Sequence, residues 1–178
     1  RSLLQKKGHV FRSETDTEVI AHLVETCYKG DLTKAVLETL SLLKGTYGIV
    51  VMHRNHPDMM VGARNGSPLI MGVGDDEMFL ASDASAIISH TKQVIYLQDG
   101  EVVTITPDSF RTMDLDENEI EKDIDIIEWK AESFEKSGYD HFMLKEIFEQ
   151  SKSIVRGMSG RLDRENATGH LGGLNLTS

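Results

Sequence analysis

The stretch GTYGIVVMHRNHPDMMVGA, residues 45–63, is where the hydrophobic period of this sequence changes. It contains two short apolar runs, residues 47–52 and 59–63, whose composition is that of buried strands. Between them, Asn55-His56-Pro57-Asp58 has the residue types of a turn. The stretch therefore predicts two neighbouring strands of a sheet.

Before this stretch, apolar residues recur at helical spacing. They predict a helix over residues 17–28 and a second helix that starts at Gly30-Asp31 and is closed by Gly45. The apolar stripe of the second helix consists of Leu32, Val36, Leu40 and Leu43. Residues 1–7, followed by Gly8, have the pattern of a helix end. We therefore expect the chain to begin part-way through a helix, as a fragment of a longer protein does.

After this stretch, short apolar runs continue at regular spacing, at residues 69–73, 78–81, 93–97, 102–105 and 110–113. They are separated by hairpin or turn signals at Asn65-Gly66, residues 72–76 and Asp99-Gly100. Residues 83–88 predict one short helix. This part of the sequence is therefore expected to form a mainly antiparallel sheet.

The last third of the chain is more polar. An acidic connector at residues 114–123 precedes a predicted strand at 124–128 and a predicted helix at 141–155. Residues 157–178 are rich in Gly, Asn, Ser and Thr and are expected to be a linker or a frayed end. Two helices, a run of hairpins and a final helix predict an α+β fold.

Composition excludes several classes of function. The net charge of −10 argues against a nucleic-acid partner, which normally requires a basic face. No apolar run approaches the ~20 residues of a membrane helix, and the N-terminus does not resemble a signal peptide. Cys27 is the single cysteine, so no internal disulfide is possible and a reducing, cytoplasmic location is expected.

Several local patterns suggest sites and fail on inspection. Residues 72–76 have the glycines of a phosphate loop, but two acids follow them, so a hairpin turn is expected. Asp114, Asp116 and Asn118 match the first ligand offsets of a calcium loop, but Glu119 replaces its glycine. A solvated acidic loop is the better interpretation.

The remaining candidates fail as well. His53, His56 and Asp58 lie across a predicted turn with no fourth ligand at metal-site spacing. Cys27 lies on the apolar stripe of a predicted helix, where a buried hydrophobe is expected. No Gly-x-Ser-x-Gly nucleophile turn occurs. The residues alone therefore assign no catalytic residue, no metal ligand and no cofactor.

Asp16 is a different kind of candidate. Thr15-Asp16-Thr17-Glu18 fits the capping box, in which a Thr hydroxyl and a Glu three residues later satisfy each other's backbone N–H groups. An acid in a first helical turn also suits the helix dipole. On local grounds Asp16 is a helix-start residue.

Four stretches together resemble a known family. SETDTEVIAHLV (13–24), the segment 45–87, VIYLQDGEVVTI (94–105) and YDHFMLKEIFEQ (139–150) resemble the glutaminase domains of glutamine–fructose-6-phosphate aminotransferases. These domains are class II glutamine amidotransferases, and the segment 139–150 points to the sugar enzymes in particular. The resemblance runs from Leu3 to about Leu162.

The resemblance implies a fold and an activity. The fold would be the four-layer α/β/β/α sandwich of the N-terminal-nucleophile hydrolases, incomplete here because its N-terminal part is missing. In the family an N-terminal cysteine attacks the glutamine amide, with its own α-amino group as base. This chain begins with Arg1, so the nucleophile is missing and we expect the chain alone to be inactive.

The resemblance also implies the domains and one binding residue. Residues 1–156 would be the C-terminal part of the glutaminase domain, and residues 157–178 a linker toward an absent sugar isomerase domain. Asp16 matches the family carboxylate that binds the α-ammonium of L-glutamine, and an ionised carboxylate suits that role. A homodimer of the parent enzyme is expected, with no membrane partner.

Two alternatives stay open. The chain could belong to another class II amidotransferase, such as the purine-pathway enzyme. It could also be a non-catalytic binding module of the same fold, because the nucleophile is missing. A cut sandwich would leave apolar faces and sheet edges exposed, so we expect the chain to self-associate.

Overall fold

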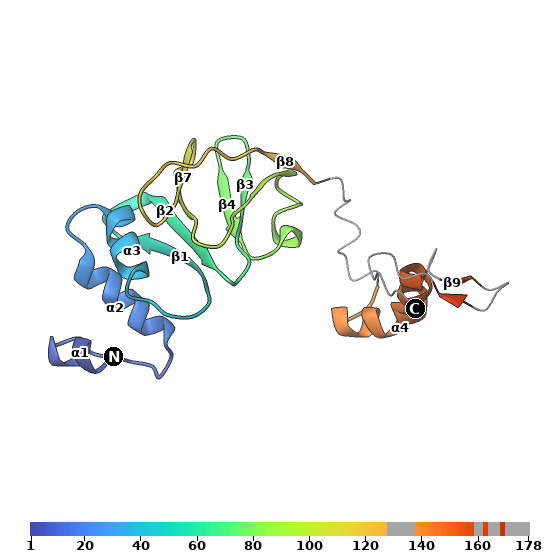
Figure 1. The fold of residues 1–178 in the computed structure, drawn as a ribbon, viewed down its shortest axis with the longest axis horizontal. Helices are drawn as coiled ribbons and strands as arrows, with labels where there is room; N and C mark the ends of the chain where they lie inside the picture. Colours follow the sequence, from blue (N-terminus) through green and yellow to red (C-terminus); the bar gives the residue numbers. More distant parts are fainter. Residues whose placement is uncertain (128–137, 159–161, 164–167, 170–178) are drawn as a thin grey trace, which may run out of the picture. The chain divides into compact units, whose positions relative to one another are not determined.

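The computed structural model of the chain describes residues 1–127, 138–158, 162–163 and 168–169. The chain divides into two compact units, residues 1–131 and 132–178, which are described separately. In the described residues, unit 1 has three α-helices and two four-stranded sheets (Figure 1). The described residues of unit 2 form one long helix and two very short strands.

The helices of unit 1 are α1 (Ser2–Lys6), α2 (Thr17–Cys27) and α3 (Leu32–Leu40). α1 and α2 begin and end within about a residue of their predicted bounds, whereas α3 ends at Leu40, before the predicted Leu43 and Gly45. α1 stops before Gly8, whose φ of +94° is the left-handed conformation that glycine favours. α3 starts at Asp31, whose carboxylate accepts a hydrogen bond from the Lys34 N–H at 3.0 Å.

The first sheet is antiparallel, in the order β1-β2-β6-β7. Its strands are β1 (Tyr47–His53), β2 (His56–Asn65), β6 (Val102–Ile105) and β7 (Phe110–Met113). The predicted turn at residues 55–58 is wrong in its position. His53 pairs with His56, so the chain reverses at residues 54–55 and Pro57 already lies in β2. A register shift beside Met52 accommodates the extra residues of β2.

The second sheet is also antiparallel, in the order β4-β3-β5-β8. Its strands are β3 (Ile70–Val73), β4 (Met78–Ala81), β5 (Gln93–Tyr96) and β8 (Asp125–Ile126). The predicted short helix at residues 83–88 is the 3-10 helix η1 (Ala84–Ala86), which Asp83 caps through the Ser85 N–H. These elements confirm the predicted strands and short helix to within a few residues.

Two of the predicted hairpins are corners between the sheets instead. Asn65-Gly66 ends β2 in the first sheet and leads to β3 in the second, whereas Asp99-Gly100 leads back from β5 to β6. The two corners bind each other, because the Asp99 carboxylate accepts from the Gly66 N–H at 2.8 Å and from Arg64 Nε at 3.0 Å. The chain does turn at both places, but the hairpin interpretation is wrong, because a two-residue turn does not reveal whether the next strand stays in the same sheet.

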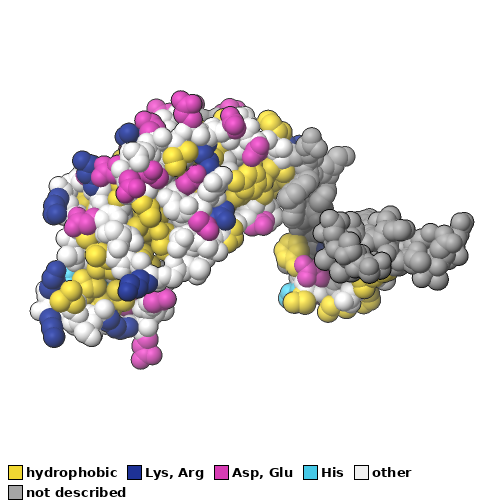
Figure 2. Space-filling model, viewed as in Figure 1, with side chains coloured by type: hydrophobic (Ala, Val, Ile, Leu, Met, Phe, Trp, Pro, Cys, Tyr) yellow, Lys and Arg dark blue, Asp and Glu magenta, His cyan; other side chains and the backbone are white. Residues whose placement is uncertain are grey.

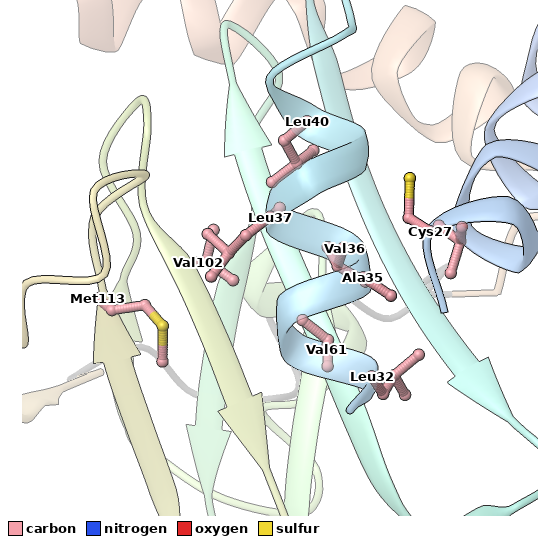
Figure 3. Packing of buried hydrophobic residues seen from close by; sticks show 11 residues of the cluster. Cys27, Leu32, Ala35, Val36, Leu37, Leu40, Val61, Val102 and Met113 are labelled. Carbon is pink, nitrogen blue, oxygen red and sulfur yellow. The ribbon is translucent and has the colours of Figure 1, made fainter. Parts of the chain in front are cut away.

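The core of unit 1 lies in two layers on opposite faces of the first sheet. Val102 of β6 belongs to a cluster with α2 and α3, whereas its neighbour Val103 belongs to a cluster with the second sheet. The helix-side cluster is shown in Figure 3. Gly62 lies between the sheets, where an added Cβ would meet Leu69, Leu80 and Val103 at 3.1 Å. Helices, first sheet and second sheet thus form successive layers of the predicted α+β fold.

Unit 2 contains α4 (Phe142–Met158), β9 (Leu162–Asp163) and β10 (Thr168–Gly169), and the two strands pair antiparallel. α4 confirms the helix predicted at residues 141–155. Apolar side chains remain exposed along it, as the surface view shows (Figure 2). They include Met143, Ile147, Phe148, Ile154 and Val155. The other residues of the predicted linker lie outside the described residues.

Candidate functional site

Asp16 lies immediately before α2 and is exposed to solvent. Its backbone is already helical, with φ −72° and ψ −30°, and its side chain makes no capping hydrogen bond to α2. Among the described residues, its side chain accepts one hydrogen bond, from the Thr17 hydroxyl at 3.5 Å, which is longer than a good O–H···O bond. The Asp16 carboxylate therefore stands at a helix start without capping that helix.

The predicted capping box is wrong because Glu18 binds elsewhere. Its carboxylate accepts from the backbone N–H groups of Arg12 at 2.6 Å and Ser13 at 2.7 Å, and from the Ser13 hydroxyl at 2.6 Å. These hydrogen bonds, with the Arg12 N–H the strongest contributor, lower the pKa of Glu18 from 4.5 to about 2. Glu18 therefore fixes the segment that leads into Asp16 and leaves Thr15 out of the cap.

A shallow apolar groove begins beside Asp16. It has a volume of about 370 Å³ and lies between α2 and β1. Its lining residues are Thr17, Ile20, Ala21, Val24, Gly48, Ile49, Val50, Val51 and Met52. Thr17, the residue that follows Asp16, lines this groove, so the backbone of Asp16 adjoins one end of it. A ligand with an ammonium group and a short aliphatic part would match a carboxylate next to an apolar surface.

The groove follows a sheet edge. Among the described residues, β1 pairs only with β2, so the other side of β1 is an open edge. Val50 and Met52 on this strand are 42% and 68% exposed, unlike the buried centre of the same sheet. An open edge with exposed apolar side chains is a surface on which another strand can pair.

The structure also shows what the calcium-loop and phosphate-loop patterns of the sequence form. The Asp114 carboxylate accepts from the N–H groups of Asp116 and Asn118 and from the Asn118 amide, so it closes its own loop. The Asn118 hydrogen bonds, first of all that of its side chain, lower the pKa of Asp114. Residues 72–76 form the β3–β4 hairpin, with the Gly74 N–H bonded to Glu77 O.

The structure places His53 and His56 against Tyr28 and confirms that Cys27 is buried. His53 stacks on Tyr28 with ring centroids 4.2 Å apart, and His56 Nε2 lies 2.9 Å from the Tyr28 hydroxyl. Neither belongs to a metal-ligand cluster in the described residues. Cys27 is 7% exposed inside the helix-side core, as expected for a buried hydrophobe.

Sequence reasoning missed one cluster. His9, His22 and Glu25 lie together, with their ligand atoms within 4.8 Å of one another. His22 and Glu25 are three residues apart on α2, which places them on one helix face. His9 lies 13 residues before His22, on the segment that Glu18 fixes, so no local spacing pattern contains all three.

Comparison with known proteins assigns the first half of the chain to a family. Residues 1–89 match the family described as "Glutamine amidotransferase domain". The chain is 47% identical over 164 residues to the glutamine–fructose-6-phosphate aminotransferase (isomerizing) of Aquifex aeolicus, and 44% identical over 165 residues to that of Thermotoga maritima. These matches cover 92% and 93% of the chain. The chain spans only 28% and 27% of the length of these relatives.

Solved structures give a similar result. A glutamine phosphoribosylpyrophosphate amidotransferase from B. subtilis, complexed with ADP and GMP, matches with a TM-score of 0.54 and 27% identity. The match covers 66% of this chain and 26% of that one. Within the described residues, no helix has the length and apolar character needed to cross a bilayer.

Proposed function

Because this chain belongs to the glutamine amidotransferase family, we propose that it forms part of the glutaminase unit of a glutamine–fructose-6-phosphate aminotransferase. The full enzyme would release ammonia from L-glutamine and transfer it to fructose 6-phosphate, forming glucosamine 6-phosphate. Support comes from identities of 43% to 47% with aminotransferases of this name, against 27% with the phosphoribosylpyrophosphate amidotransferase. The purine-pathway alternative is therefore disfavoured.

In this proposal Asp16 binds the α-ammonium group of glutamine. The observation that carries it is the position of Asp16 at the start of α2, next to the groove along β1. Its carboxylate is exposed and does not cap the helix. A carboxylate that capped its own helix would have fewer lone pairs for a ligand. Charge-assisted hydrogen bonds between a carboxylate and an ammonium are among the stronger ones in proteins.

The nucleophile must come from outside this sequence. Cys27 is the single cysteine and is buried in the helix-side core, where a thiolate would be desolvated and out of reach of substrate. We therefore expect the chain alone to lack glutaminase activity. Its partners in the parent polypeptide would be the remainder of the glutaminase domain and, after residues 157–178, a sugar isomerase domain. We place the parent in the cytoplasm as a homodimer.

The test uses the full-length protein and measures ammonia release from glutamine. Asp16→Asn is expected to raise KM for glutamine about 10- to 100-fold, because a hydrogen bond to a charged group contributes about 1.5–3 kcal/mol. Asp75→Asn is the matched control, since it makes the same charge change on the exposed β3–β4 turn. Its KM is expected to stay at the wild-type value.

Glutaramate, which is glutamine without its α-amino group, isolates the proposed contact. With this substrate, Asp16→Asn and wild type are expected to give similar kinetics, because the partner of the carboxylate is already missing. If Asp16→Asn lowers activity equally on both substrates, Asp16 does not bind the ammonium. If the full-length protein releases no ammonia from glutamine, the proposed function itself is wrong.

A further inference from the structure

Three ligand atoms form a small triangle where α2 meets the segment before it. His9 Nδ1 lies 3.1 Å from His22 Nδ1, and Glu25 Oε2 lies 3.3 Å from the first and 3.4 Å from the second. In a tetrahedral zinc site with bonds of about 2.0–2.1 Å, neighbouring ligand atoms are roughly 3.3–3.4 Å apart. The triangle therefore already has the dimensions of one face of such a site.

The hydrogen bonds around His9 determine which of its ring nitrogens is free. The Thr26 hydroxyl donates its proton to the His22 carbonyl at 2.7 Å, so its oxygen can only accept from His9 Nε2, which lies 3.1 Å away. A proton on Nε2 leaves a lone pair on His9 Nδ1, which faces the other two atoms. Thr26 thereby orients His9 as a ligand.

His22 has a similar arrangement. Its Nε2 lies 3.8 Å from the Glu18 carboxylate, which can only accept, and this favours the proton on Nε2. The Nδ1 lone pair of His22 then points toward His9 Nδ1 and Glu25. Two lone pairs and a carboxylate oxygen meet with no donor between them, an arrangement that a cation stabilises.

We propose that His9, His22 and Glu25 bind one divalent transition-metal ion, with zinc as the best match. Two imidazoles and a carboxylate are typical zinc ligands, whereas calcium and magnesium prefer oxygen ligands alone. Metal-binding histidines commonly have an oxygen partner at the other ring nitrogen, and here the Thr26 hydroxyl lies 3.1 Å from His9 Nε2 and the Glu18 carboxylate 3.8 Å from His22 Nε2. Glu25 is 69% exposed, so water has access to a fourth coordination position.

The metal would join two parts of unit 1. His9 lies between α1 and α2, and its side chain is 17% exposed, whereas His22 and Glu25 are on α2. A bound ion would fix the segment that leads into Asp16 against the helix that Asp16 starts. It would therefore stabilise the folded state, and the stabilisation would grow with the logarithm of the free-ion concentration above Kd. This inference does not depend on the proposed function.

The test uses the full chain without an affinity tag, freed of metal by chelator and dialysis. Calorimetric titration with Zn²⁺ at neutral pH is expected to show one ion per chain, together with a rise in Tm. Glu25→Gln, an isosteric change on an exposed side chain, and His9→Gln are each expected to weaken binding at least 10-fold. His141→Gln is the control, because His141 lies on unit 2 outside the cluster.

A second measurement does not depend on the variants folding well. In the wild-type chain, ¹⁵N NMR is expected to show the Nδ1 resonances of His9 and His22 moving on addition of Zn²⁺, with those of His53 and His56 unchanged. If no stoichiometric binding occurs, or if Glu25→Gln and His9→Gln bind Zn²⁺ as tightly as wild type, the site is a metal-free hydrogen-bond cluster and the proposal is wrong.

Discussion

Asp16 and Asp31 both stand directly before a helix, but only Asp31 caps one. Asp31 has an extended backbone, with φ −115° and ψ 114°, which is the conformation that lets a side chain turn back to the first N–H groups. Asp16 has a helical backbone and cannot do this. The backbone conformation of each aspartate thus decides its role. Asp31 caps its helix, whereas the carboxylate of Asp16 is available to a ligand.

Asp114 allows a test of local electrostatics at the residue scale. Hydrogen bonds from Asn118 hold its pKa below the ordinary value of 3.8. Because the folded pKa lies below the unfolded one, the stabilisation is complete above about pH 4 and is lost as the pH falls through the folded pKa. Asn118→Ala is expected to raise the pKa of Asp114, measured by an NMR pH titration of its carboxyl carbon.

Asp83 is the control for that titration. Hydrogen bonds from Ser85, on a different loop, lower its pKa, so Asn118→Ala should leave it unchanged. An Asp114 pKa that stays the same in the variant would show that the Asn118 side chain does not lower it.

At the scale of elements, a buried ion pair joins the β5–β6 corner to the segment after β7. Lys122 Nζ lies 2.8 Å from one Glu101 oxygen and 2.9 Å from the other, and the two side chains are 11% and 8% exposed. Glu101 also accepts from the Gln98 N–H at 2.7 Å. The pair therefore connects the chain's return from the second sheet to the connector that leads toward β8.

Lys122→Met is expected to destabilise the protein by about 3 kcal/mol, because it leaves a buried carboxylate without its cation. Urea unfolding followed by circular dichroism measures the change. The matched control is Arg111→Met, which breaks the exposed pair with Glu119 and should cost about 1 kcal/mol or less. Adding Glu101→Gln to Lys122→Met should recover part of the loss, and equal effects at the two sites would contradict this account.

At the scale of the whole molecule, each unit exposes apolar surface that a folded domain normally buries. In unit 1 this surface is the open edge of β1, with Val50 and Met52. In unit 2 it is the apolar side of α4. The self-association expected from the sequence therefore has identifiable surfaces.

We expect the sedimentation-average mass of the isolated chain to rise with concentration. Val50→Lys should reduce this rise, because a lysine on an edge strand opposes strand pairing. Leu42→Lys is the control, since Leu42 is 60% exposed and lies in the loop between α3 and β1, outside the edge strand itself. A chain that stays monomeric at all concentrations would exclude edge pairing.

Most elements of this fold could be predicted from the sequence. Helix and strand periods, the glycine after α1 and the aspartate before α3 are local signals, because they depend on residues within one or two turns of each other. The burial of Cys27 could be predicted because the apolar residues of α2 recur on one face of the helix, and that face packs against the core. The family resemblance supplied the interpretation of Asp16, which local chemistry alone treated as a cap.

The tertiary structure alone decided the features that depend on distant residues. It turned two predicted hairpins into the corners between sheets, because a turn determines a reversal but not the partner of the next strand. It moved Glu18 from its own helix start to the N–H groups of Arg12 and Ser13. It also brought His9 to His22 and Glu25. The sequence determined the elements because their signals, the hydrophobic period and the turn chemistry, are local. Packing decided the contacts of Glu18 and of the His9, His22 and Glu25 cluster, because these contacts join separate segments.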